Sequence, residues 1–377
     1  MEARRAPSED AAAAASADET PRVLAGTLAK RSVVLDCRWL GYGGAGRITE
    51  LLLAELRQAP PFGSWTLWGS PARVEPLAFD GARVEALEGD PHAFFGQRAL
   101  LRVPRGDVVL YLHQIRPLRP GRSVTVIHDT IPLRYGGNRV LRLVKHAFFF
   151  AAARLTAHVL TDSELSKEAI VRDLRVPARR ISVMRFPVDV ARARRVADVR
   201  AATGQRDVLL YVGRFDTHKN LHRLCEAFAR TRFAASGGEL ELVGGGTAEV
   251  RSLTDWLRDA GIERVRVRGA CSEAELDHLL ATSRALIAPA LEEGYGLPAF
   301  EAAASGLPVA ASRTGAMPEL GAAAVLFDPW RTDEMTAAID EVTARAAGPP
   351  TSFSQDRLRE PVLRVLAAAL AEARPNE

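Results

Sequence analysis

The amino-acid sequence predicts an α/β protein of two doubly wound, Rossmann-like domains that face a central cleft. Three observations lead to this prediction. Short β-branched runs alternate with amphipathic stretches of helical period, which is the pattern of βαβ units and parallel sheets. The alternation forms two series, separated by a basic stretch without a clear period. The length of 377 residues suits two domains of about 150–200 residues each better than one core.

The first series is expected to form a domain over residues 23–190. Its strands are predicted at 32–36, 65–68, 107–112, 124–127 and 158–161, and helices at 47–57 and 141–155. Residues 1–22 are rich in Ala, Ser, Glu and Asp and contain no Leu, Ile, Val or Phe. Such a composition cannot bury enough apolar surface to fold, so we expect a disordered tail.

The second series is expected to form a domain over residues 207–350, after a linker at 191–206 within the irregular basic segment 187–206. Its strands are predicted at 208–212, 239–243, 264–268, 285–288 and 309–312, and its helices at 221–231, 247–260, 273–282, 298–304 and 333–346. The segment 351–377 contains a last amphipathic helix at 358–373, which can pack back on the first domain. Two such domains in tandem place a ligand cleft between the carboxyl ends of both sheets.

The composition is ordinary for a globular protein, with 47% apolar and 25% charged residues. A net charge of +4 suits phosphate-bearing ligands or an anionic membrane surface, but it is too mild to indicate nucleic-acid binding. The three cysteines, Cys37, Cys225 and Cys271, lack metal-ligand spacing and indicate a reducing compartment. No run approaches the roughly 20 apolar residues of a membrane span. We therefore expect a cytoplasmic protein.

A glycine and two cations follow the predicted strand 208–212. Gly213, Arg214 and Lys219 lie at the carboxyl end of that strand, where ligands of α/β proteins bind. Arg214 can grip phosphate oxygens with its planar guanidinium, and Lys219 supplies a mobile point charge. Together they could neutralise a diphosphate leaving group. The alternative is a solvated loop with ordinary surface charges.

The loop after the next strand is a run of glycines, Gly244, Gly245 and Gly246, before a predicted helix. Glycines at such a place let backbone N–H groups approach an anion at the helix N-terminus. A tight turn without a ligand is the alternative.

The segment from Glu293 to Glu301 carries the most specific pattern. The residues before its predicted helix are Glu293, Gly294, Tyr295, Gly296 and Leu297. Pro298 suits the first helical turn, which places Glu293 in the loop and Glu301 in that turn. Both carboxylates can then accept hydrogen bonds from hydroxyls of one ligand, while the amides of Gly296 and Leu297 meet a phosphate. An acidic residue at the positive end of a helix explains Glu301 but not the glycine spacing.

Taken together, these segments resemble the large retaining GT-B glycosyltransferase family that includes many mannosyl- and glucosyltransferases, family 4 in the usual classification and group 1 by domain type. The matching segments are 161–166, 211–220, 242–246, 293–309, 312–319 and 326–329. The resemblance covers about residues 32–345 and is stronger in the second half. Segment 184–189 departs from the family pattern at the interdomain turn, and His218 stands where Arg or Lys is more usual.

The resemblance implies a role for each matching residue. Arg214 and Lys219 are expected to hold the diphosphate, Glu293 to contact hydroxyls of the donor sugar, and Glu301 to bind the ribose hydroxyls. The expected catalytic residues are His128, Arg214, Lys219 and Glu293. The expected donor-binding residues are Gly44, Asp129, Gly213, Gly245, Arg268, Gly294, Tyr295, Gly296, Leu297 and Glu301. Among them, Arg268 begins the segment where the family usually seats the base.

In the first domain, the glycine-rich turn 41–47 and His128 follow predicted strands. The resemblance places the turn near the donor phosphate and the acceptor, and His128 beside the transferred sugar, with His113 as a further residue of the cleft. Without the resemblance, the turn reads as a flexible surface loop and a lone histidine is more often structural.

The region 133–154 is basic and amphipathic. Its cations are Arg134, Arg139, Arg142, Lys145 and Arg154. It could dock on the inner face of a membrane that carries a lipid-linked acceptor. It could equally be a buried helix with solvated arginines.

The sequence therefore predicts a hexosyltransferase that moves mannose or glucose from a nucleotide-diphosphate sugar to a hydroxyl of a glycan, a lipid-linked saccharide or a small molecule, with retention of configuration. The donor is a substrate, and no cofactor is expected. The sequence has no Asp-x-Asp motif, so metal independence is a hypothesis. Two other classes remain open: a GT-B epimerase or phosphorylase, and a non-catalytic nucleotide-sugar-binding protein.

Overall fold

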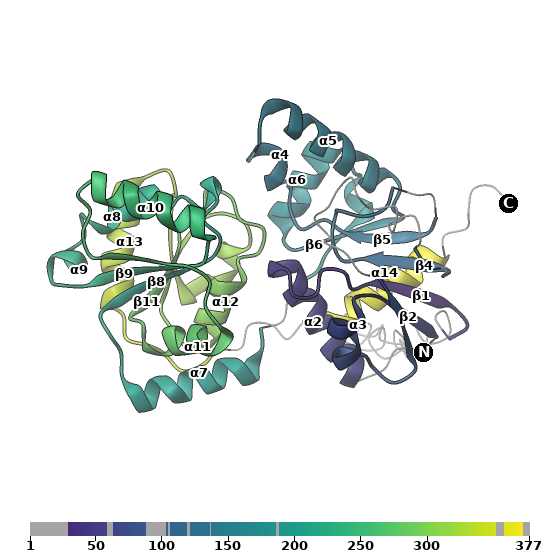
Figure 1. Cartoon of the computed structure of the whole chain (residues 1–377), viewed down its shortest axis with the longest axis horizontal. Helices are drawn as coiled ribbons and strands as arrows, with labels where there is room; N and C mark the ends of the chain where they lie inside the picture. Colours follow the sequence, from purple (N-terminus) through teal and green to yellow (C-terminus); the bar gives the residue numbers. More distant parts are fainter. Residues whose placement is uncertain are drawn as a thin grey trace, which may run out of the picture.

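A computed structural model describes residues 29–58, 63–87, 103–104, 106–118, 121–135, 137–185, 188–351 and 358–371. It contains two α/β domains that lie side by side, each built on a parallel sheet (Figure 1). The tail expected at 1–22 lies outside the described residues. Within these ranges, no helix is long and apolar enough to cross a bilayer.

Among the described residues, the first domain is built on a seven-stranded parallel sheet of order β3-β2-β1-β4-β5-β6-β7. Its strands are β1 (Ser32–Asp36), β2 (Ser64–Gly69), β3 (Ala82–Ala86), β4 (Val108–Tyr111), β5 (Ser123–Val126), β6 (His158–Thr161) and β7 (Ile181–Val183). Its helices include α2 (Gly43–Gln58), α3 (Pro71–Val74), α4 (Ile131–Arg134), α5 (Arg139–Arg154) and α6 (Glu164–Leu174). The sequence pattern does not identify β3 and β7, because β3 carries Arg83 and Glu85 among its five residues and β7 has only three residues.

The second domain is built on a six-stranded parallel sheet of order β10-β9-β8-β11-β12-β13. Its strands are β8 (Val208–Val212), β9 (Glu239–Val243), β10 (Val265–Arg268), β11 (Ala285–Ala288), β12 (Val309–Ser312) and β13 (Ala324–Phe327). Its helices include α8 (Leu221–Phe228), α9 (Arg232–Ala235), α10 (Thr247–Asp259), α11 (Glu273–Thr282), α12 (Leu297–Ala304) and α13 (Thr332–Ala344). The strand order reverses between β8 and β11, and ligands bind at such switch points.

The segment expected to be irregular contains a helix instead, α7 (Val190–Thr203). Asp189 caps it, because its side chain accepts a hydrogen bond from the backbone N–H of Arg192 at 2.9 Å. The buried side chains of α7 include Arg192, Val196 and Arg200, and the helix packs on α11 and α12. The sequence pattern missed the helix because two arginines occupy positions on its buried face, where apolar residues are expected.

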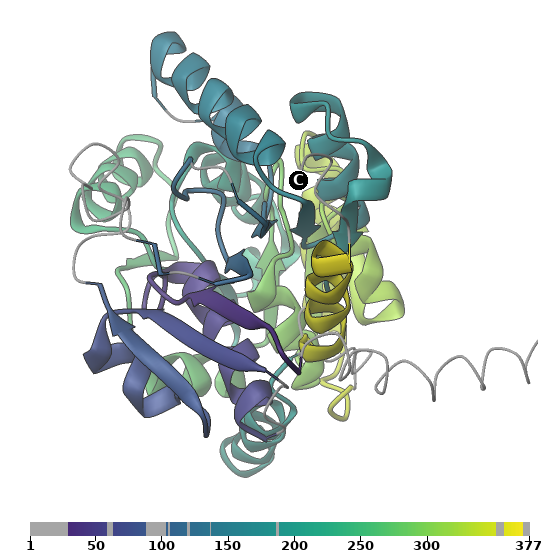
Figure 2. The same ribbon diagram turned by 90° about the vertical axis from the view of Figure 1, so that its right-hand side faces the viewer.

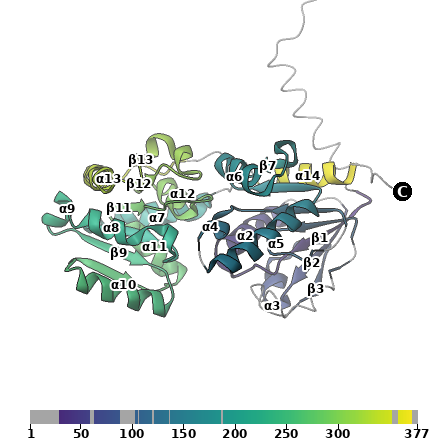
Figure 3. The same ribbon diagram turned by 90° about the horizontal axis from the view of Figure 1, so that it is seen from above.

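The last described helix, α14 (Arg359–Ala371), lies on the first domain, where it contacts α2, β4 and β5 (Figures 1 and 2). Arg122 Nη1 donates to the carbonyl of Leu370 at 3.3 Å, and Leu358 N donates to Glu55 Oε1 at 3.2 Å. Seen from above, α14 lies on the opposite side of the first domain from α3 (Figure 3). The first domain is thus completed by residues from the far end of the chain.

Candidate active site

The loops after β8 and β11 bring together a cation and a carboxylate. Lys219 ends the short 3-10 turn η4 (Thr217–Lys219) that follows β8, and Glu293 lies in the loop between β11 and α12. Lys219 Nζ lies 3.0 Å from Glu293 Oε1 and 2.8 Å from Oε2. Both side chains are less than one fifth exposed, at 17% and 18%. The structure therefore joins two of the predicted residues in one partly buried pair.

Arg214 lies in the same loop as Lys219 but is directed to solvent. Its side chain is 79% exposed, and its Nε lies 2.9 Å from Asp216 Oδ2. The structure does not bring Arg214 onto the Lys219–Glu293 pair. An exposed pair of this kind contributes little stability, so the guanidinium can exchange Asp216 for another anion at small cost.

Glu301 lies in α12 with its side chain 16% exposed. Because α12 begins at Leu297 rather than Pro298, Glu301 stands at the start of the second turn and not in the first as expected. Its carboxylate accepts a hydrogen bond from Arg192 Nη1 at 2.9 Å. Burial raises the pKa of Glu301, and the charges of Arg192 and Arg47 oppose that rise.

The loop before α12 is shaped by glycines. Gly296 has φ +85°, and a methyl group there would collide with Met317 Cε, so only glycine fits this turn. A side chain at Gly294 would lie 3.2 Å from Asp129 Oδ2 and 3.6 Å from Asp162 Oδ2, which places Gly294 against the first domain. Tyr295 is buried and stacks on Phe300, with 4.5 Å between the ring centroids.

Three further predicted residues lie around these loops. A side chain at Gly213 would contact Tyr211 Oη at 2.7 Å, and one at Gly245 would contact the Phe215 ring at 2.6 Å, so the loops after β8 and β9 are closely packed. Arg268 ends β10, is 44% exposed and lies 3.6 Å from Glu241 Oε1.

His128 is held on both ring nitrogens by acceptors. Its Nδ1 lies 3.0 Å and 3.1 Å from the two oxygens of Asp162, and its Nε2 lies 3.1 Å from the carbonyl oxygen of Leu112. With Asp162 ionised, both partners are acceptors, so this geometry favours the doubly protonated imidazolium. Burial alone would lower the pKa of His128. The charge of Asp162 and its hydrogen bond, with the charge of Asp129 and the hydrogen bond to Leu112, together outweigh burial, and the pKa lies above its ordinary value.

Two carboxylates, Asp162 and Asp129, act on this histidine, and Glu293 acts in turn on both of them. Burial and then the charge of Asp162 raise the pKa of Asp129 to about 6, and burial also raises the pKa of Asp162. The charge of Glu293, from the second domain, raises both pKa values further. Asp162 was not among the predicted residues. It follows β6 as His128 follows the neighbouring β5, and this shared position at the carboxyl edge is the signal that could have identified it.

The glycine-rich turn of the first domain is the start of a helix, because α2 begins at Gly43 and includes Gly44 in its first turn. A side chain at Gly44 would find open space within 4 Å. Arg47, in the next turn, lies 3.8 Å from Asp189 Oδ2. His113 stacks on Trp39, with 3.7 Å between the ring centroids, and its ring lies 5.7 Å from that of His128.

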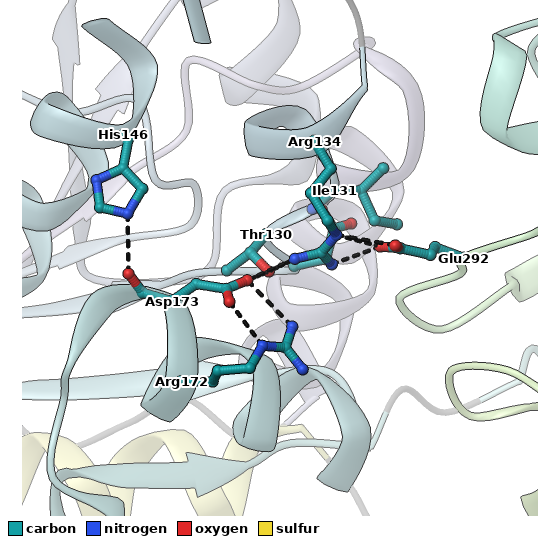
Figure 4. A network of polar contacts seen from close by, with 8 residues as sticks. Thr130, Ile131, Arg134, His146, Arg172, Asp173 and Glu292 are labelled. Atoms are coloured by element: carbon teal, nitrogen blue, oxygen red, sulfur yellow. Dashed lines mark hydrogen bonds and ion pairs between the residues drawn. The ribbon is translucent and has the colours of Figure 1, made fainter. Parts of the chain in front are cut away.

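An ion-pair network connects the two domains beside the site (Figure 4). Arg134, at the end of α4, binds Asp173 of α6 with 2.5 Å between Nη1 and Oδ2. The same guanidinium donates from Nε and Nη2 to Glu292 of the second domain. Tyr135 and His218 add a second contact between the domains, with 5.5 Å between ring centroids.

Comparison with known proteins bears on both domains. Residues 206–345 match the family model described as "Glycosyl transferases group 1". The chain is 35% identical over 197 residues to an MMP alpha-(1->4)-mannosyltransferase of Mycolicibacterium hassiacum, covering 50% of this chain and 45% of that protein. It is 28% identical over 217 residues to an O-antigen chain mannosyltransferase of Salmonella typhimurium, covering 57% and 58%. It is 30% identical over 279 residues to a glycogen synthase of Mycobacterium tuberculosis, covering 64% and 66%. The chain thus spans about half to two thirds of the length of these relatives.

Solved structures resemble the whole described architecture. A sucrose-phosphate synthase from Thermosynechococcus elongatus superposes with a TM-score of 0.63 at 18% identity, covering 90% of this chain and 94% of that one. HepE of Anabaena, in complex with UDP and glucose, superposes with a TM-score of 0.61 at 18% identity, with the same coverage. These likenesses confirm the predicted fold of two doubly wound domains, which is the GT-B fold.

Proposed function

We propose that this chain, a GT-B protein of the group 1 glycosyltransferase family, transfers a hexosyl group from a nucleotide-diphosphate sugar to a hydroxyl acceptor. The observation that carries the proposal is the Lys219–Glu293 pair. It joins the carboxyl ends of β8 and β11 inside the segment that matches the family. Mannose and glucose are the proposed sugars, since two of the relatives are named mannosyltransferases and a third is named glycogen synthase, and glycogen is a polymer of glucose.

In the proposed complex, the donor replaces the Lys219–Glu293 pair with two separate contacts. The diphosphate takes the ammonium of Lys219, and hydroxyls of the sugar donate to the freed carboxylate of Glu293. The first amides of α12 have no intrahelical acceptors, so they can also meet a phosphate oxygen. Arg214 turns from Asp216 to the diphosphate. Lys219 thus keeps an anionic partner and Glu293 keeps hydrogen-bond donors, so neither partly buried group is left unsatisfied, which keeps the cost of the exchange low.

The proposed chemistry is cleavage of the anomeric C–O bond through an oxocarbenium-like state. Lys219, Arg214 and the positive end of α12 stabilise the charge that develops on the departing diphosphate, which supports a metal-independent reaction. The leaving phosphate accepts the acceptor's proton, and attack from its own side retains the configuration. The imidazolium of His128 offsets the charges of Asp129 and Asp162, which would otherwise repel the phosphate.

The surface of α5 supports a narrower proposal about the acceptor, namely that it is associated with a membrane. The sequence left two interpretations of this region, a buried helix and a membrane-docking face, and the structure has features of both. Phe149 and Ala153 are buried, whereas Val140 and Leu143 are 71% and 70% exposed. With Leu141 and Val144, they make up four of the eight large apolar side chains exposed in the described part of the chain. Positions 140 and 149 lie about two and a half turns apart, on opposite sides of the helix.

Basic residues accompany this exposed apolar surface: Arg139, Arg142 and Lys145. An apolar face flanked by cations fits the interface of an anionic bilayer. Sedimentation with vesicles of phosphatidylglycerol should deplete the wild-type chain, while vesicles of phosphatidylcholine should not. The variant Val140→Ser/Leu143→Ser should stay in the supernatant, and equal sedimentation of both proteins would refute this assignment.

The donor proposal is tested by binding and turnover together. A thermal-shift panel of GDP-, UDP-, dTDP- and ADP-sugars should give one donor that raises the melting temperature by mass action. That donor should then be consumed only when an acceptor hydroxyl is present, in buffer that contains EDTA. Binding without turnover across acceptors would instead support a nucleotide-sugar-binding protein, and activity that returns only with Mg²⁺ would overturn metal independence.

A further inference from the structure

Helix α7 carries two buried arginines that differ in how completely the protein satisfies them. Arg200 donates from Nε to the carbonyl of Ala281, from Nη1 to that of Ser305 and from Nη2 to that of Leu280. All three of its nitrogens have protein acceptors, so Arg200 attaches α7 to the second domain. Arg192 lies two turns earlier and on the same side of the helix.

Arg192 is 93% buried, with 7% of its surface exposed, yet its hydrogen bonds are incomplete. Its Nε lies 2.7 Å from Asp277 Oδ1, and its Nη1 lies 2.9 Å from Glu301 Oε1. Its Nη2 has no hydrogen-bond partner among the described residues. A buried donor without an acceptor costs about 1–3 kcal/mol, so an acceptor from a ligand would find it unsatisfied.

Helix electrostatics gives no reason for a cation at this position. Asp189 caps α7, which puts Arg192 at the third helical position, near the positive end of the helix dipole. A cation in the first turn of a helix is disfavoured by roughly 0.3–1 kcal/mol. The two carboxylates that Arg192 binds lie on α11 and α12. Its place is thus explained by those two carboxylates.

We propose that Arg192 is a specificity-determining residue of the donor site: it orients Glu301 toward the ribose of the nucleotide and donates from Nη2 to the same ribose hydroxyls. This inference rests on the proposed function, in which Glu301 binds the ribose. A hydroxyl can donate to a carboxylate and accept from a guanidinium at once, so a vicinal diol satisfies both groups. A 2′-deoxyribose leaves one carboxylate lone pair and one N–H unpaired in a buried site. The chain should therefore select ribonucleoside donors over 2′-deoxyribonucleoside donors.

The experiment compares the affinities of UDP, GDP and ADP with those of their 2′-deoxy counterparts by titration calorimetry. For the nucleotide that the wild-type chain binds best, we expect about a 10- to 100-fold preference for the ribo form, the range of one or two hydrogen bonds to charged groups. Arg192→Met should reduce this ratio to about threefold or less. With the corresponding sugar nucleotide, the same variant should raise KM for the donor and change kcat little.

Arg200→Met is the matched control. It removes a buried arginine from the same helix and should lower the melting temperature while leaving the ribo-to-deoxy ratio unchanged. Should Arg192→Met not fold, Arg192→Lys carries the test, because it keeps a cation for Asp277 and Glu301 but loses the planar guanidinium, and the ratio should still fall. The ratio does not depend on the folded fraction, since both nucleotides compete for the same folded molecules.

The outcomes separate this inference from the proposed function. A wild-type chain that binds none of the three ribonucleotides and none of the sugar nucleotides of the donor panel overturns both, whereas one that binds only the dTDP-sugar overturns the role of Arg192 alone. A wild-type chain that binds ribo and deoxy forms equally, or an Arg192 variant that keeps the wild-type ratio, overturns the role of Arg192 alone. The role of Arg192 is also overturned if Arg200→Met lowers the ribo-to-deoxy affinity ratio as much as Arg192→Met does. The effect would then come from the packing of α7 on the second domain.

Discussion

Arg134 of the first domain binds the carboxylate of Glu292 of the second, with its Nε 2.8 Å from Oε1 and 2.9 Å from Oε2. Glu292 directly precedes Glu293, the partner of Lys219. The relative position of the two domains is therefore linked to the loop that we propose binds the donor sugar.

The first prediction concerns this contact between domains. Arg134→Gln should favour a more open arrangement and lower kcat about fivefold, because a half-exposed ion pair of about 1 kcal/mol shifts an open–closed equilibrium by that factor. Small-angle scattering and steady-state kinetics measure the two effects. Arg172→Gln is the control, since Arg172 binds Asp173 in the same network, and both of these residues belong to the first domain. Identical kinetics in the two variants would contradict a role for Arg134 in closure.

The second prediction separates the two cations of the proposed diphosphate site. Arg214→Ala should leave the free energy of unfolding unchanged within about 0.5 kcal/mol, because this side chain is 79% exposed, yet lower kcat/KM at least about tenfold. Lys219→Ala should lower both activity and stability, the latter by roughly 1–3 kcal/mol, because it leaves the Glu293 carboxylate unpaired. Denaturant unfolding and donor turnover measure these quantities. Wild-type turnover in both variants would refute the site.

The third prediction concerns pH. Asp129 has a pKa raised from 3.8 to about 6 by burial and by Asp162, so between these pH values the folded chain binds a proton that the unfolded chain does not. The raised pKa of His128 acts in the same direction above pH 6.5. Stability should therefore fall as pH rises from 5 to 8.

The variant that tests this dependence is Asp129→Asn. It keeps an acceptor for the N–H of Ile131, which donates to Asp129 at 2.9 Å, and removes the titrating carboxyl. We expect this variant to be more stable than the wild type at pH 7.5 by roughly 1–3 kcal/mol. Its melting temperature should also change less with pH than that of the wild type. Asp259→Asn, at a position with a 73% exposed carboxylate, should follow the wild-type curve. A wild-type melting temperature that rises from pH 5 to 8 would contradict the assignment.

The fourth prediction uses two glycines of nearly equal φ. Gly81 has φ +82° with open space around it, whereas Gly296 has φ +85° and faces Met317 and Glu293. Gly81→Ala should cost only the left-handed backbone conformation, about 1–2 kcal/mol. Gly296→Ala should cost more and also weaken donor binding, because the methyl group displaces Glu293. Melting temperature and donor Kd of both variants decide the matter, and equal losses of stability with unchanged donor binding would argue against a shaped loop.

The fold was predictable from the sequence to the extent that apolar runs mark it. Strands such as β8 and β11 are buried on both faces, so their sequences are continuous apolar runs. The edge strands β3 and β7 and the helix α7 were not predictable in this way. Helix α7 buries arginines, and only the distant acceptors on α11 and α12 make such burial favourable.

The candidate site was predictable as a set of positions but not as a set of contacts. Motif spacing places Lys219 and Glu293 at the carboxyl ends of strands, and the structure pairs them. Motif spacing could not indicate that Arg214 pairs with Asp216, because an exposed loop side chain has several rotamers of similar energy. Nor could motif spacing identify Arg192, since its partners Asp277 and Glu301 lie far away in the sequence.

The seating of α14 on the first domain has a consequence for synthesis on the ribosome. Residues 190–344, from α7 to α13, are contiguous, so the second domain has all its parts as soon as they leave the exit tunnel. The first domain emerges earlier but lacks the apolar face of α14, whose buried side chains include Leu366 and Leu370. The domain translated first is therefore the one completed last. Until then, its uncovered sheet face is the surface on which a nascent chain would recruit a chaperone or aggregate.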